Sequence, residues 1–206
     1  VTRRKSPPDF ALPVGVELIE LKSLASTWSK VLSLVWVLVS GRWFSIVKDL
    51  RRTKTPLNVY TFKVALAYME SVARMERELA QAWEGPLKGW IWYSYWCDDA
   101  AYLLAQWQKK GKIDRSFCRV HNTDVYMERH PCSYLPFRKF IHEQLSGILA
   151  ISEHARRYLW VQTPRASSRI FLSRLGVPSQ VAIPAANGHP FRLLSLSKIS
   201  PVKNLE

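Results

Sequence analysis

The chain has 206 residues, of which 48% are hydrophobic, so it can form one domain with a buried core and part of a second. Thirty Lys and Arg against 16 Asp and Glu give a net charge of +14, which predicts affinity for polyanions, anionic lipid headgroups or phosphorylated ligands. Charge alone does not choose among these partners. No G-x-G-x-x-G, Walker A loop, nucleophile elbow or zinc-ligand spacing is present, which argues against simple dinucleotide-binding, nucleotide-triphosphatase, hydrolase and metalloenzyme functions.

The three cysteines, Cys97, Cys118 and Cys132, are odd in number and too far apart for a C-x-x-C clip. We expect reduced thiols, as in a cytoplasmic protein, and no metal site. The first residues, VTRRKSPPDF, do not have the pattern of a signal peptide. The chain begins with Val1 and ends just after a strand and a helix start, so the sequence favours a fragment that is incomplete at both ends.

The first part of the chain contains an expected strand at Val14–Leu21 and a helical, unusually apolar pattern from Thr27 to Leu50. The apolar run VLSLVWVLV is far shorter than the ~20 residues that span a bilayer. Two interpretations stay open, a buried helix and an interfacial helix on an anionic membrane. The second depends on aromatic residues that stand beside bases: Trp28, Trp36, Trp43 and Phe44, with Lys30, Arg42, Lys48, Arg51, Arg52 and Lys54.

After Pro56, the spacing predicts a long amphipathic helix over Val59–Trp83. The aromatic run Trp90–Tyr95 predicts a strand, and acidic residues at Asp98-Asp99 followed by bases and Gly111 frame a helix. Phe117–Val120 predicts a buried strand, because apolar residues give way abruptly to polar ones.

The same order then repeats. A helix is expected over Phe137–Leu145, a strand over Ile148–Ile151, and a further helix with Ser152 as its N-cap. This alternation predicts an α/β fold with a Rossmann-like, doubly wound parallel sheet. Ligands of such sheets gather at the carboxyl ends of the strands, here His121 to Asp124 and Ser152 to His154.

Arg169–Leu175 is a further expected strand, and the Pro- and Gly-bearing segment that follows is a linker candidate. We therefore expect a Rossmann-like domain over residues 1–185, and over 186–206 a linker and the first strand, Phe191–Leu196, of a second domain. Lys198 and Lys203 could converge on a phosphate at the next helix N-terminus, although two lysines in a surface loop are commonplace. For His121, a structural or merely exposed histidine is the competing interpretation.

Several blocks resemble the retaining glycosyltransferases of family 4 with the two-domain GT-B architecture, above all the exopolysaccharide transferases of the colanic acid and amylovoran type. The matching blocks are WYSYWCDDAAYLLA, CRVHNTDVYMERHP with YLPFRKF, GILAISEHARRYL, RIFLSRLGVP and SLSKISPVKNLE. The family pattern is Arg-x-His followed by Asp and Tyr, then Ser-Glu at a helix start, then Ser-Arg-Leu-x-Pro-x-Lys opening the second domain. The resemblance is strong from near Trp90 to the end.

The resemblance implies roles for six residues. His121 would be the catalytic histidine beside the transferred sugar, and Asp124, Ser152 and Glu153 would lie on the acceptor and sugar side. Lys203 would hold the donor diphosphate together with Lys198, which replaces the arginine usual in the family and loses its bidentate fork. The family's first strand would precede Val1, and the carboxylates of its E-x7-E pattern would follow Glu206.

The implied function is transfer of a sugar from a nucleotide-sugar to a lipid-linked glycan acceptor in surface polysaccharide biosynthesis, at the inner face of the plasma membrane. The nucleotide-sugar is a substrate, so no cofactor is expected, and the fragment by itself should be inactive. The alternative is a basic module that binds nucleic acid or a membrane surface without catalysis, supported by the +14 charge and nine Trp. Nucleic acid is not the expected partner, because the aromatics fall mostly in apolar runs rather than between Lys and Arg.

Overall fold

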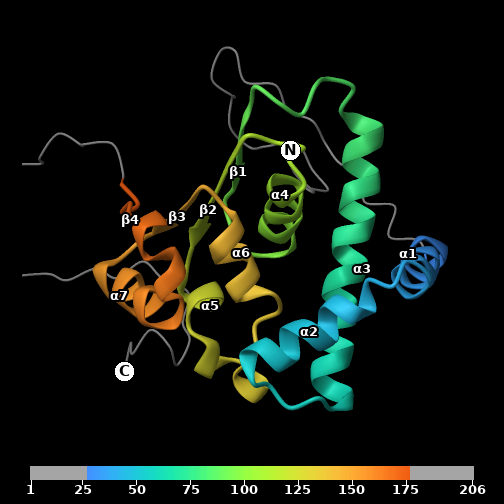
Figure 1. Ribbon diagram of the computed structural model, residues 1–206, viewed down its shortest axis with the longest axis horizontal. Helices are drawn as coiled ribbons and strands as arrows, with labels where there is room; N and C mark the ends of the chain where they lie inside the picture. Colours follow the sequence, from blue (N-terminus) through green and yellow to red (C-terminus); the bar gives the residue numbers. More distant parts are fainter. Residues whose placement is uncertain (1–26, 177–206) are drawn as a thin grey trace, which may run out of the picture. The chain divides into compact units, whose positions relative to one another are not determined.

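The structure is a computed structural model that describes residues 27–176 (Figure 1). The expected strands Val14–Leu21 and Phe191–Leu196, the linker and the predicted domain boundary at residue 185 lie outside the described residues. The described part contains seven α-helices and four strands, and from Trp90 onwards strands alternate with helical segments in the order that the sequence predicts. No helix of residues 27–176 is long and apolar enough to cross a membrane.

The helical pattern from Thr27 to Leu50 is divided into two helices, α1 (Thr27–Val39) and α2 (Trp43–Thr53). The division falls at Gly41, whose φ of 69° lies in the left-handed region that glycine adopts without steric cost. The helix α2 ends at Lys54, also left-handed, whose N–H bonds back to the last turn. The expectation of one helical stretch was therefore correct in type but missed this turn.

The long helix α3 (Val59–Ala82) confirms the amphipathic helix expected after Pro56. Its start is fixed by a capping box, in which Thr61 N donates to Asn58 Oδ1 at 2.9 Å and Asn58 N donates to Thr61 Oγ1 at 3.2 Å. Both α1 and α2 pack against α3, which in turn contacts the helix α4 (Asp99–Lys109) beside the sheet (Figure 1). The long helix thus separates α1 from the sheet.

The four strands form one parallel sheet in the order β1-β2-β3-β4: β1 (Ile91–Ser94), β2 (Arg115–Val120), β3 (Gly147–Ala150) and β4 (Ile170–Leu172). Their register places Ser94 beside Cys118 and Cys118 beside Ile148. The expected parallel strands at Trp90–Tyr95, Phe117–Val120 and Ile148–Ile151 are confirmed. The last strand is shorter than the expected Arg169–Leu175: a 3-10 helix over Pro164–Arg169 takes up its first residue, and the strand ends at Leu172.

The connections are helical, as parallel strands require. They are α4 (Asp99–Lys109), α5 (Asn122–Val125), two 3-10 turns at Met127–Arg129 and Pro131–Ser133, α6 (Arg138–Gln144) and α7 (Glu153–Gln162). The expected N-cap is confirmed, because Ser152 Oγ accepts a hydrogen bond from Ala155 N at 3.1 Å. Asp98, expected as an acidic residue at a helix start, also caps α4, since it accepts a hydrogen bond from Ala100 N at 3.0 Å. The sequence did not indicate α5 or the two 3-10 turns.

Alternate residues of the strands differ in burial. Cys118, Val120, Ile148 and Ala150 are fully buried beneath the helical layer, in which α4 packs against α6. On the opposite face, the side chains remain exposed or half-buried: Ile91, Tyr93, Phe117, Leu149 and Phe171. The described residues thus form an α/β fold with a four-stranded parallel sheet, consistent with a Rossmann-like domain. The four strands lie across the sheet in the order in which they occur in the chain. A doubly wound sheet combines two such windings that run in opposite directions, and the described part contains one of them.

Candidate functional site

The carboxyl ends of β1, β2 and β3 meet at one edge of the sheet. The register aligns Val120 with Ala150 and Ser94 with Cys118, so the loops that start at Tyr95, His121 and Ile151 leave from the same side. Polar and aromatic side chains follow the strands at this point. This edge is where parallel α/β sheets bind ligands, and it contains four of the six predicted site residues.

His121 is the most distinctive residue of this edge. Its ring packs against those of Tyr95 and Trp96, with centroid distances of 4.9 Å and 4.1 Å. The residue is 9% exposed, and both ring nitrogens are buried and have no hydrogen-bond partner among the described residues. A buried nitrogen without a partner is costly, on the order of 1–3 kcal/mol. Neither nitrogen is accessible in this arrangement, so a ligand would supply the missing hydrogen bonds once a neighbouring ring moves aside.

Asp124 braces the loop that carries His121. One carboxylate oxygen accepts a hydrogen bond from His121 N, and the other accepts one from Cys97 N at 2.8 Å. Burial raises the pKa of this carboxyl, and the nearby Cys97 sulfur raises it further, whereas the two N–H donors oppose the change. Both oxygens are engaged by backbone groups, so in this structure Asp124 joins the β1 and β2 loops and positions His121.

Ser152 and Glu153 have local contacts at the start of α7. Ser152 caps the helix, and Glu153 forms ion pairs with Arg156 at 2.8 Å and Arg157 at 3.1 Å. The hydrogen bond from Arg156, followed by that from Arg157, lowers the pKa of Glu153. Both residues thus lie at the carboxyl edge of the sheet with their side chains already engaged. Lys198 and Lys203 lie outside the described residues.

Sequence reasoning missed the surroundings of His121. Tyr95 and Trp96 were assigned to a strand and its end, although two aromatic residues beside a strand terminus were a usable signal.

Sequence reasoning also missed Arg138, on α6, which is 5% exposed and donates a hydrogen bond to the Cys97 carbonyl. In the sequence it resembles any charged helix residue, so no local signal could have revealed its burial.

Arg138 also alters the chemistry of the thiol beneath the loop. Burial by itself raises the pKa of Cys97, but the hydrogen bond from Cys118 and the positive charge of Arg138 lower it well below the usual value. The sulfur lies 4.0 Å from His142 Nε2, whose other ring nitrogen is 3.1 Å from Thr163 Oγ1. This cluster is fully enclosed, which suits it to fixing the loop rather than to meeting a ligand.

The described residues contain no metal site of the usual composition. In residues 27–176, no group of three or more His, Cys, Asp or Glu could hold a metal ion.

Comparison with known proteins finds no matching family model, no matching curated protein and no matching solved structure. The geometry of the sheet edge and the sequence motifs therefore carry the functional argument.

Proposed function

We propose that this chain is the acceptor-side half of a retaining GT-B glycosyltransferase, which transfers a sugar from a nucleotide-sugar to a lipid-linked glycan in surface polysaccharide biosynthesis. The observation that supports this best is His121, which is buried against two aromatic rings at the carboxyl edge of a parallel sheet and whose ring nitrogens have no partner among the described residues. In the proposed enzyme, a further set of strands completes the doubly wound sheet, and a second domain binds the donor.

The edge has the parts that a sugar site needs. Tyr95 and Trp96 are about half exposed, at 48% and 46%, so their rings offer apolar faces to the C–H groups of a pyranose. Two different sugar hydroxyls could bond to the neutral ring, one donating to the unprotonated nitrogen and the other accepting from the protonated one. Asp124 holds the backbone of this histidine in place through its bond to His121 N. Positioning of this kind lowers the barrier for transfer by orienting the reacting sugar.

The leaving group requires positive charge. Cleavage of a sugar–diphosphate bond develops negative charge on the departing oxygen, which fixed cations and helix N–H groups stabilise. In this proposal, Lys198 and Lys203 supply the cations from the donor-side half. The proposed assignment thus divides the reaction between two halves, with sugar positioning at His121 and diphosphate binding at the lysines.

The helices α1 and α2 support a peripheral position on the anionic inner face of the plasma membrane. Several apolar side chains of α1 are exposed, including Leu32 at 58% and Val39 at 82%, and Phe44 on α2 is exposed at 63%. The same helix, α2, also carries exposed basic residues: Lys48, Arg51 and Arg52. Apolar side chains beside bases are typical of helices that lie in an anionic interface. This surface also favours the second candidate function, a membrane-binding module without catalysis.

Sugar transfer by the whole protein that carries this chain distinguishes the two functions. A panel of nucleotide-sugars is incubated with polyprenyl-diphosphate-linked acceptors, and products are measured by mass spectrometry. We expect His121→Ala to lower transfer by about 10²-fold or more, while His130→Ala serves as the control because its ring already bonds the Thr123 carbonyl. Circular dichroism verifies that each variant is folded. Sugar transfer by His121→Ala at the wild-type rate would show that His121 is not part of the site. Membrane binding by the whole protein with no transfer from any donor would support the second candidate, a membrane-binding module without catalysis.

A further inference from the structure

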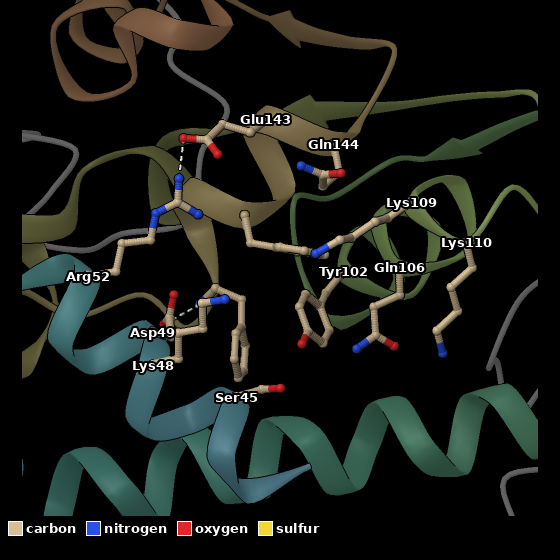
Figure 2. A pocket seen from close by; sticks show the side chains of 12 residues that line it. Ser45, Lys48, Asp49, Arg52, Tyr102, Gln106, Lys109, Lys110, Glu143 and Gln144 are labelled. Carbon is tan, nitrogen blue, oxygen red and sulfur yellow. Dashed lines mark hydrogen bonds and ion pairs between the residues drawn. The ribbon is translucent and has the colours of Figure 1, made fainter. Parts of the chain in front are cut away.

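A cavity of about 490 Å³ lies between α2, α4 and α6, on the helical side of the sheet (Figure 2). It is lined by Ser45, Lys48, Asp49, Arg52, Tyr102, Gln106, Lys109, Lys110, Phe137, Phe140, Glu143 and Gln144. None of these is a predicted site residue. Its volume is within the range of about 300–1,000 Å³ that small-molecule sites occupy.

Positive charge dominates the lining. Four cations, Lys48, Arg52, Lys109 and Lys110, face two acids, Asp49 and Glu143. Both acids are already engaged. Asp49 Oδ2 accepts hydrogen bonds from Tyr134 and from the backbone of Phe137, and Glu143 is paired with Arg52.

The lysines lack such partners. No acidic side chain within residues 27–176 forms an ion pair with Lys48, Lys109 or Lys110. Figure 2 shows Lys109 extending from α4 into the space between α4 and α6, where its ammonium lies 5.3 Å from the Phe140 ring centroid. The cavity therefore has an excess of positive charge that an anionic ligand would neutralise.

The remaining lining offers apolar contact and a buried amide oxygen. The rings of Tyr102 and Phe137 stack with centroids 4.4 Å apart, and Phe140 contacts Tyr102 edge-on at 5.4 Å. Gln106 Oε1 is buried and accepts no hydrogen bond from any described residue. In Figure 2, Gln106 and Tyr102 extend from α4 side by side. A ligand hydroxyl that donates to Gln106 would satisfy this oxygen.

We propose that this cavity binds a phosphorylated polyol, with its phosphate beside Lys109 among the cations of the lining and a hydroxyl on Gln106. The phosphate is the shared chemistry of two sources, a free polyol phosphate and the headgroup of an anionic phospholipid. The site is separate from the sheet edge at His121, and its existence does not depend on glycosyl transfer.

Titration with glycerol 3-phosphate, followed by calorimetry or by amide shifts in NMR, tests the site directly. We expect saturable binding that the double variant Lys109→Gln/Lys110→Gln weakens by about tenfold or more, since two cations are removed. The control, Lys63→Gln/Lys88→Gln, removes the same charge from exposed positions outside the lining. No saturable binding, or equal weakening in both double variants, overturns the proposal.

A second comparison tests the hydroxyl contact. Ethyl phosphate carries the same charge without hydroxyls, so the wild-type chain should bind glycerol 3-phosphate more tightly. Gln106→Leu should reduce glycerol 3-phosphate binding to the level of ethyl phosphate. Equal binding of the two probes by the wild-type chain overturns the assignment of a polyol.

Vesicles containing phosphatidylglycerol, compared with neutral phosphatidylcholine vesicles, identify the source of the phosphate. If Lys109→Gln/Lys110→Gln loses both soluble-ligand and vesicle binding while the charge-matched control keeps both, the ligand is a lipid headgroup. If it loses glycerol 3-phosphate binding alone, the ligand is a free phosphorylated polyol. Both outcomes support the cavity as a phosphate site.

Discussion

The hydroxyl of Tyr134 donates a 2.9 Å hydrogen bond to Asp49 Oδ2, across 85 residues of sequence. Phe137 N donates to the same oxygen at 2.9 Å, and Asp49 is only 4% exposed. These bonds attach α2 to the loop that leads into α6. Since Lys48 and Arg52 flank Asp49 on α2, the same attachment positions two of the cations that line the cavity.

Removal of the Tyr134 hydroxyl should destabilise the fold. A buried carboxylate that loses a donor costs about 1–3 kcal/mol, so we expect Tyr134→Phe to lower the free energy of unfolding by that amount in urea denaturation. Tyr60→Phe is the matched control, because Tyr60 is exposed on α3. Equal stability of the two variants would show that the Asp49–Tyr134 bond makes no net contribution.

The stability of the chain should depend on pH through Asp98. Burial, together with repulsion from Asp99, raises the pKa of Asp98 from 3.8 to about 6. The folded state therefore binds this proton more tightly than the unfolded state does, and the resulting stabilisation is fully present below about pH 4 and lost as the pH rises through about 6.

Asp98→Asn isolates this effect, because asparagine retains the N-cap function and does not titrate. We expect the difference in free energy of unfolding between wild type and variant to change across that pH window in favour of the variant as the pH rises. Urea denaturation at a series of pH values measures this difference. Parallel stability profiles for the two proteins would contradict the raised pKa.

Membrane binding should depend on the exposed apolar side chains of α1. We expect Val39→Asp to reduce co-sedimentation with anionic vesicles severalfold, because it places a negative charge at the apolar interface. Val161→Asp is the matched control, since Val161 on α7 is 77% exposed and Val39 is 82% exposed. Wild-type binding should rise with anionic lipid content and fall with salt. Equal binding to neutral and anionic vesicles would show that electrostatic attraction does not contribute to membrane binding by this surface.

The thiols should differ in reactivity. Cys132 is exposed, whereas Cys97 and Cys118 are buried. Titration of the native protein with a disulfide reagent should therefore modify Cys132 alone, and denaturant should expose the other two. Cys132→Ser should abolish the native-state reaction. Rapid modification of Cys97 in the folded chain would show that the loop between β1 and α4 opens readily.

The local sequence determined the elements and many of their ends. Alternation of apolar strands with helical spacing predicted the parallel sheet, because hydrophobic periodicity reflects which face of each element is buried. Ser152 was readable as a helix cap, because an N-cap bonds to N–H groups two or three residues away, and Asp98 was readable as an acidic residue at a helix start. The carboxyl edge at His121 followed from strand order alone.

Only the tertiary structure decided which distant side chains meet. The burial of Arg138 beneath Cys97, the rings of Tyr95 and Trp96 around His121, and the bond from Tyr134 to Asp49 all join residues from different elements. The cavity likewise combines α2 with α4 and α6. Periodicity and capping act over a few residues, whereas these contacts depend on how the helices pack, and that information is spread over the whole chain.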